Sequence, residues 1–112
     1  MKIGIDKGYY ETGELQSEMS YSNFGIKEGT FKWYRKTGEL EFEIPYKNDK
    51  KNGIQRWYFK NGKKMLETPF VDDKEHGVEK WYCVYTGDVV KEITYKKGKK
   101  QKTIYKKVKS KK

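Results

Sequence analysis

Residues 29–46 read GTFKWYRKTGELEFEIPY, and residues 53–70 read GIQRWYFKNGKKMLETPF. The two stretches share two glycines, a basic residue, a Trp-Tyr pair, a glutamate and a proline, each displaced by 24 residues. A fixed period of this length is typical of repeat architectures, in which each copy forms one supersecondary unit. The sequence therefore predicts a repeat protein.

The pattern continues on both sides of these two stretches. Trp81 extends the tryptophan series, and Tyr10 is placed in register with Tyr34, so that Tyr9 stands where later copies have Trp. A second block consists of a turn glycine, a glutamate five residues later and an aromatic residue three positions further on. Its members are Gly13, Glu18 and Tyr21; Gly38, Glu43 and Tyr46; Gly62, Glu67 and Phe70; and Gly87, Glu92 and Tyr95. We infer about four copies of 24 residues.

Each copy reads as two short strands around a tight turn. Ten Tyr, five Phe and three Trp accompany only three Leu and no Ala, a composition that favours strands over helices. Glycine behind a small polar residue, as in Asn61-Gly62, supplies the positive φ of a hairpin turn. The predicted fold is all-β: an elongated single antiparallel sheet of stacked β-hairpin repeats. Pro45 and Pro69 are expected at a strand end or a bulge, because proline cannot donate to a ladder.

The net charge of +10 comes from the C-terminal residues of the chain. Residues 96–112 contain ten lysines and no acidic residue, so residues 1–95 are formally neutral. We therefore divide the chain into hairpin repeats (1–95) and a lysine-rich C-terminal cap or tail (96–112). Because a nucleic-acid-binding domain usually spreads its basic residues over a folded face, this distribution argues against nucleic acid as the partner.

Two aromatic ladders are expected on opposite faces, since adjacent residues of a strand alternate. One ladder holds the tryptophans and the other holds the tyrosines that follow them; at most one needs to be the core. Exposed aromatic side chains suit a protein interface or self-association, although packed ladders would explain them equally. The candidate partner-binding residues are Trp33, Trp57 and Trp81 with Lys32, Arg56 and Lys80. The repeated glutamates are interpreted as structural partners of these basic residues across strand pairs.

The lysine-rich segment admits two interpretations. It could bind anionic lipid or another polyanion, or it could form a final edge strand protected by its charges, because Ile104, Tyr105 and Val108 recur at strand-like spacing. The candidate polyanion-binding residues are Lys96, Lys97, Lys99, Lys100, Lys102, Lys106 and Lys107.

The sequence shows no constellation for catalysis. Cys83 and His76 are the sole residues of their types, and identical residues in every copy suit architecture better than a unique active site. We expect no enzyme activity, no catalytic residue, no cofactor and no metal site. The expected location is the cytoplasm, with an exported or membrane-anchored precursor as the alternative if the chain is a mature fragment.

The repeating unit has the form Gly-x-x-Lys-Trp-Tyr, then Asn-Gly-Lys, then Glu-x-x-Tyr, then Lys-Asn-Gly-Lys-x-x-Gly. This unit resembles the variant MORN repeat (MORN_2 type) of bacterial proteins, the class that includes the YwqK-family antitoxins. The resemblance covers roughly residues 7–102. It implies a non-enzymatic module that binds another protein, such as a toxin, or, in eukaryotic relatives, acidic phospholipids. Asp49 and Asp73 depart from the family loop, which usually has glycine there; Lys64 stands where Leu40 and Val89 do.

Overall fold

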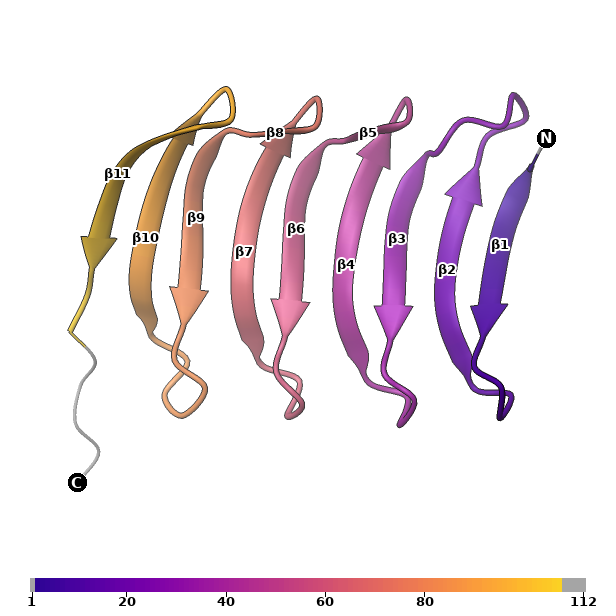
Figure 1. The fold of residues 1–112 in the computed structure, drawn as a ribbon, viewed down its shortest axis with the longest axis horizontal. Helices are drawn as coiled ribbons and strands as arrows, with labels where there is room; N and C mark the ends of the chain where they lie inside the picture. The colour runs from indigo at the N-terminus through magenta and orange to yellow at the C-terminus, as the bar shows by residue number, and fades with distance from the viewer. Residues whose placement is uncertain (1, 108–112) are drawn as a thin grey trace.

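The computed structural model describes residues 2–107, and all its regular structure is β (Figure 1). Its strands form one open sheet in the order β1-β2-β3-β4-β6-β7-β9-β10-β11, with the short β5 paired to β4 and β8 paired to β7. Their bounds are β1 Gly4–Tyr9, β2 Leu15–Tyr21, β3 Gly29–Tyr34, β4 Leu40–Lys47, β5 Lys50–Lys51, β6 Gly53–Tyr58, β7 Lys64–Val71, β8 Lys74–Glu75, β9 Gly77–Tyr82, β10 Val89–Lys96 and β11 Lys99–Tyr105. The predicted all-β fold of stacked hairpins is confirmed.

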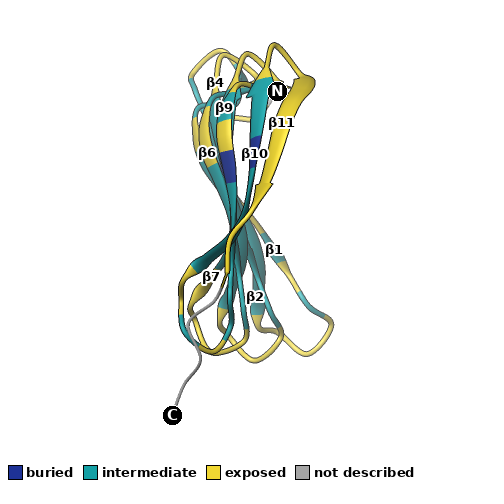
Figure 2. Ribbon diagram, turned by 90° about the vertical axis from the view of Figure 1, so that its left-hand side faces the viewer, coloured by how far each residue is buried: buried dark blue, intermediate teal, exposed yellow. Residues whose placement is uncertain are grey.

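The sheet is an elongated, twisted single layer. Its extents are 51 × 36 × 15 Å, so its thickness is that of one sheet with side chains on both sides (Figure 2). The radius of gyration is 16.3 Å, whereas a compact chain of this length would have about 13 Å. Both faces of the sheet are therefore open to solvent, with no second layer among the described residues.

Each copy is one hairpin with a long internal ladder. The pairs β3/β4, β6/β7 and β9/β10 each match six residue pairs, and β1/β2 does the same. In β3/β4 the ladder runs from Gly29 opposite Tyr46 to Tyr34 opposite Leu40, with a bulge next to Trp33. Lys64 takes the place of Leu40 in the third hairpin, opposite Tyr58. The hairpin prediction holds in all four copies.

Ladders between copies are much shorter. β2/β3, β4/β6 and β7/β9 match two residue pairs each. In β7, the ladder to β9 covers Leu66 and Glu67 and stops before Pro69, which has no N–H to donate. Pro45 and Pro69 thus lie inside β4 and β7, third from the end, at the point where the junction with the next copy opens. The expectation of a strand end is corrected in this sense.

The turns that follow β4, β7 and β10 have two residues with positive φ. These φ values are 52° and 66° at Asn48-Asp49, 47° and 70° at Asp72-Asp73, and 50° and 83° at Lys97-Gly98. The aspartates therefore keep the conformation that glycine has in the last turn. Asp73 adds a contact that glycine cannot make, because its Oδ1 accepts a hydrogen bond of 2.8 Å from the backbone N–H of Lys51 in β5. Asp49 repeats this bond with Lys27, also at 2.8 Å.

The first copy lies one residue away from its predicted register. Tyr9, not Tyr10, pairs with Leu15 as Tyr34 pairs with Leu40, and Gly8 pairs with Ser17 at the tryptophan position. Tyr10 instead opens the turn, where its N–H donates to Glu14 O as Arg35 donates to Glu39 O. The physical reason is the turn, which has the same length in both copies and fixes the register of the strands that follow it.

Candidate protein-binding face

Strand alternation divides the side chains of the sheet into two sets. We call one set the aromatic face: Trp33, Phe42, Trp57, Leu66 and Trp81 follow one another across the junctions, and the next row comprises Met19, Phe31, Ile44, Gln55, Thr68, Glu79 and Ile93. We call the other set the charged face: Lys7, Glu18, Lys32, Glu43, Arg56, Glu67, Lys80 and Glu92. The core belongs to the aromatic face, because all five buried side chains of the described region lie in its second row: Met19, Ile44, Thr68, Glu79 and Ile93.

The tryptophans are linked through Phe42 rather than to one another. Ring centroids are 6.0 Å apart in the stacked Trp33 and Phe42 pair and 4.4 Å apart in the stacked Phe42 and Trp57 pair. Phe31 adds a tilted contact of 6.0 Å to Phe42. Such offset or tilted pairs contribute about 0.5–1.5 kcal/mol beyond their buried area. The result is a continuous aromatic strip over β3, β4 and β6.

Trp81 lies apart from this strip. Leu66 separates it from Trp57, and the ammonium of Lys91 lies 4.5 Å from the Trp81 ring centroid. The indole N–H of Trp81 donates to Glu79 Oε1 at 2.8 Å, while Thr68 Oγ1 donates to Glu79 Oε2 at the same distance. Trp81 is therefore engaged by its own neighbours, and the continuous ring contacts belong to Trp33, Phe42 and Trp57, which are half-buried.

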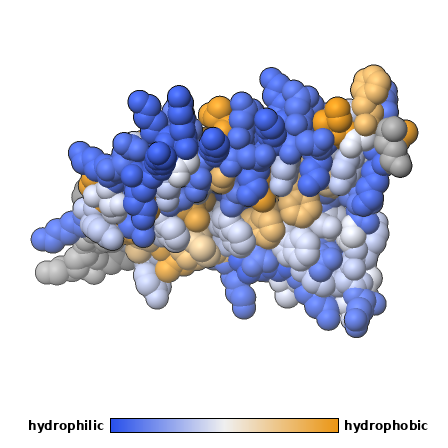
Figure 3. Space-filling model, turned by 45° about the horizontal axis from the view of Figure 1, so that its top comes forward, coloured by the Kyte–Doolittle hydropathy of each residue, from blue (hydrophilic) through white to orange (hydrophobic). Residues whose placement is uncertain are grey.

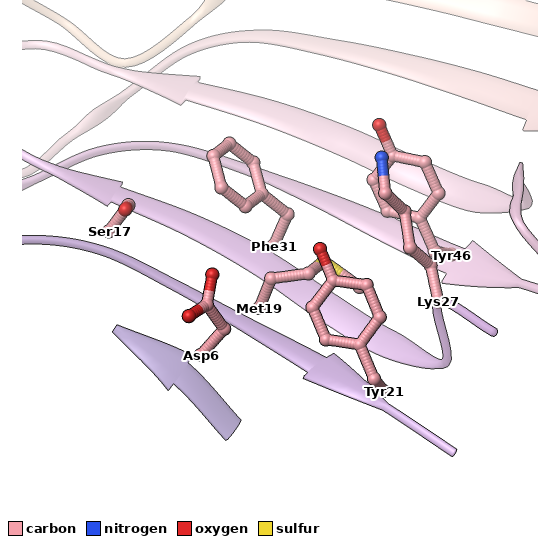
Figure 4. A pocket seen from close by; sticks show the side chains of 7 residues that line it. All are labelled: Asp6, Ser17, Met19, Tyr21, Lys27, Phe31 and Tyr46. Carbon is pink, nitrogen blue, oxygen red and sulfur yellow. The ribbon is translucent and has the colours of Figure 1, made fainter. Parts of the chain in front are cut away.

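A hollow of 140 Å³ opens on the aromatic face beside the strip (Figure 4). Met19 and Phe31 supply its apolar surface, and Tyr21 and Tyr46 supply two phenol rings around it. The ammonium of Lys27 lies 5.0 Å from the centroid of the Tyr46 ring. The aromatic face is thus recessed over β1, β2 and β3.

The predicted basic residues lie on the opposite face from the tryptophans. Lys32 stands between Glu18 and Glu43, and Arg56 between Glu43 and Glu67. The interpretation of the glutamates as cross-strand partners agrees with this register, and Arg56 Nε lies 2.8 Å from Glu67 Oε2. Positive and negative charges alternate along the whole row, so each charge has neighbours of opposite sign.

Tyrosines link one copy to the next on the charged face. Tyr34 Oη donates to Glu18 at 2.9 Å, and the same bond joins Tyr58 to Glu43 and Tyr82 to Glu67. This places the tyrosine ladder opposite the tryptophan ladder, as alternation predicts. The sequence analysis did not identify the tyrosine–glutamate pairing, although the fixed spacing of both residues in every copy was a usable signal.

Ionisation of these groups follows from their contacts. Burial and the hydrogen bond to Glu43 raise the pKa of Tyr58 to about 12, and burial with the bond to Glu67 raises the pKa of Tyr82 to about 12. Burial alone would raise the pKa of Glu67, but the hydrogen bonds from Tyr82 and Arg56 outweigh it, and the pKa of Glu67 is lowered. Glu67 is therefore a charged acceptor shared by three donors, since Lys64 Nζ also lies 3.5 Å from its Oε1.

The six predicted partner-binding residues thus form two sets. Trp33, Trp57 and Trp81 share one face, and Lys32, Arg56 and Lys80 share the other. A partner lying flat on one face of a sheet cannot contact both sets. The geometry brings the tryptophans together with Phe42, a residue that the sequence analysis had not selected.

The lysine-rich segment is partly strand. Lys99, Lys100 and Lys102 lie in β11, whose seven residues are all exposed. Lys96 ends β10, and Lys97 forms the turn with Gly98. Lys106 Nζ lies 3.4 Å from Glu92 Oε1, on the charged face. Val108 and the rest of the tail, 108–112, lie outside the described residues.

Two other kinds of site have no candidate residues in the described part of the chain. Residues 2–107 contain no group of three His, Cys, Asp or Glu side chains that could hold a metal ion. The same residues include no helix long and apolar enough to cross a bilayer.

An open sheet of identical hairpins, joined by the same side-chain contacts at each junction, defines a β-hairpin repeat module. The chain matches the family model described as MORN repeat variant over residues 3–23, 27–48 and 51–72, and it belongs to this family. The fourth hairpin lies beyond the matched segments, but it repeats their register with Lys80 opposite Glu92. Among curated proteins, none matches the chain. MORN repeats generally act as modules that bind proteins or membranes.

Proposed function

We propose that this chain is a protein-binding module whose partner docks on the aromatic face. One observation carries the proposal: Trp33, Phe42 and Trp57 form a continuous strip of ring contacts on a sheet that no second layer covers within residues 2–107. Large aromatic side chains supply rigid contact area at low entropic cost, and they dominate the energetics of protein interfaces.

The charged face is a poorer candidate for the same role. Its charges alternate in sign across strands, Arg56 forms an ion pair with Glu67, and its tyrosines are hydrogen-bonded to Glu18, Glu43 and Glu67. A partner covering this face would have to desolvate ions that are already satisfied, which costs free energy unless new pairs replace them. The aromatic face carries no such penalty over β3, β4 and β6.

The resemblance to YwqK-family antitoxins suggests one setting for this activity. In that setting the module would act by occlusion, with the sheet covering a surface that its target protein needs. The proposed mechanism requires no catalytic group, because burial of the aromatic strip supplies the binding free energy. The partner's matching surface would then be apolar where it meets Trp57.

The test is a comparison of two faces in one chain. Trp33→Ala in β3 and Trp57→Ala in β6 alter the aromatic face, whereas Lys32→Glu in β3 and Lys80→Glu in β9 alter the opposite face. Affinity capture from an extract of the source cells, with circular dichroism to verify folding, should lose the bound protein with the tryptophan variants and retain it with the lysine variants. Equal capture by all four variants would remove the basis of the proposal.

A second candidate is peripheral binding to anionic membranes. The supporting observation is the stretch 96–107, which has seven lysines and no acid. Figure 3 shows further hydrophilic side chains along the whole upper edge of its view of the sheet. Each lysine near an anionic surface contributes roughly 1 kcal/mol, and salt screens this attraction. Sedimentation with phosphatidylserine vesicles at two salt concentrations, with Lys99, Lys100 and Lys102 changed to Gln in a parallel sample, tests it. Salt-independent or unchanged binding would contradict this candidate.

A further inference from the structure

We propose that the outer edge of β11 binds an acidic, extended segment of a partner protein, which adds to the sheet as a further antiparallel strand. β11 is the strand at the C-terminal edge of the sheet (Figure 1). Among the described strands it pairs with β10 alone, and every one of its seven residues is exposed. This surface is separate from the aromatic face.

The pairing register of β11 shows that its outer edge could pair with a further strand. Tyr105 lies opposite Lys91 as Trp81 lies opposite Leu66, and Ile104 lies opposite Glu92 as Lys80 lies opposite Glu67. β11 is thus the counterpart of β9, which has a neighbour on both sides. Within residues 2–107 no strand fills the second side of β11, so its outward N–H and C=O groups remain a template for pairing.

β11 is held in place by its pairing with β10. β10 and β11 match six residue pairs, whereas β7 matches two with β8 and two with β9 at the preceding junction. Thr94 stands at the position of Pro45 and Pro69, and unlike proline it has an N–H, so the ladder continues through Thr94 opposite Lys102. A strand fixed along its length loses little freedom when it binds a peptide, and such preorganisation favours affinity.

The side chains select the kind of strand. Lys99, Lys100 and Lys102 occupy the first half of β11, and no acidic residue occurs between 96 and 107. Lysines on an edge repel a second basic strand, including another copy of β11, but they attract an acidic one. Ile104 and Tyr105 follow, 39% and 77% exposed. An antiparallel partner would therefore present apolar residues first and acidic residues after them.

The opposite edge of the sheet gives no comparable selection. β1 carries Asp6 and Lys7 side by side, so its edge has no single sign of charge. Gly4, at the start of this strand, has a φ of 75°, away from extended geometry. Only β11 thus combines an extended edge with a single sign of charge.

Three synthetic peptides test the proposal on the unmodified chain. The probe reads Thr-Val-Val-Glu-Thr-Glu-Glu; the second peptide has Lys in place of the three Glu, and the third has Pro in place of both Val. Fluorescence anisotropy should show binding of the probe at least tenfold tighter than that of either control. Proline removes backbone donors but keeps the acidic charge, so equal binding of the proline peptide would identify a polyanion surface instead. Absence of probe binding at millimolar concentration would also overturn the proposal.

Variants of the chain provide the reciprocal experiment. Lys100→Glu with Lys102→Glu should reverse the preference, so that the lysine peptide binds better than the glutamate peptide. Lys60→Glu with Lys63→Glu, in the exposed turn between β6 and β7, changes the net charge equally and should leave the preference unchanged. In the parent chain, the probe should slow amide hydrogen exchange in β11, which needs no mutation. Trp57→Ala should not affect probe binding, so failure of this proposal is distinguishable from failure of the aromatic-face proposal.

Discussion

Replacing Gly77 by alanine should destabilise the protein through two separable effects. Gly77 has a φ of 119°, which L side chains rarely adopt, and an added Cβ would lie 3.0 Å from Pro69 Cγ in the preceding copy. Backbone strain of this kind costs about 1–3 kcal/mol, less about 0.4–1 kcal/mol gained because alanine restricts the unfolded chain. Crowding against the proline ring adds roughly 1–3 kcal/mol. The expected loss is about 2–4 kcal/mol.

The chain contains its own control at the equivalent position of an earlier junction. Gly29 has a φ of 104°, but the Cβ built there meets Ser20 Cβ at an ordinary 3.5 Å. Gly29→Ala should therefore show strain without crowding, with a loss of about 1–2 kcal/mol. Urea denaturation followed by tryptophan fluorescence measures both variants under the same conditions.

A double-mutant cycle then isolates the contact. Pro69→Ser imitates the first junction, and in that background Gly77→Ala should cost no more than Gly29→Ala does in the parent chain. The coupling between the two sites should reach about 1 kcal/mol or more, as expected for residues in direct contact. Equal losses for Gly77→Ala with and without Pro69 would refute the steric reasoning and leave backbone strain as the whole effect.

Three further changes address other contacts. The pKa values of Tyr58 and Tyr82 are raised to about 12 in the folded chain. The stability that these tyrosines contribute is therefore present below pH 10 and falls as the pH rises toward 12. Tyr82→Phe should make this fall less steep, as measured by thermal melts across the same pH range. Asp73→Ala should lower the free energy of unfolding by about 1–2 kcal/mol in urea denaturation, because alanine neither accepts a hydrogen bond from the Lys51 N–H nor tolerates a φ of 70°. Asp73→Asn should change it by no more than about 0.5 kcal/mol. Equal losses for the two variants would contradict the assigned hydrogen bond. Thr94→Pro should speed amide exchange in β11 but not in β9, and uniform acceleration would show that the ladder to β10 is not what holds the last strand.

The sequence was sufficient to predict the repeat, the hairpins and the faces of most residues. Trp33, Trp57 and Trp81 recur with about the same period as the turn glycines. Because this period covers both the strands and the turns, it fixes the length and order of the hairpins. The first copy was misplaced by one residue because Tyr10 matched Tyr34 in type, whereas turn length decides the register. Counting from the turn glycine would have placed Tyr9 correctly.

The candidate site was predicted less well. Lys32 and Trp33 are consecutive residues of one strand, so their side chains had to lie on opposite faces, and a single site containing both was not compatible with alternation. Phe42 was not predicted as a site residue because it has no aromatic counterpart at the same position in the next copy, where Leu66 stands. Contacts that depend on a difference between copies cannot be read from what the copies share.

The junctions between copies use the same side-chain contacts. Tyrosine reaches the glutamate of the previous hairpin at three successive seams, and proline covers glycine at two of them. A unit inserted or deleted at any of these seams would meet the same chemistry on both sides. The span of the molecule can therefore change in whole steps during evolution, while every remaining seam keeps its fit.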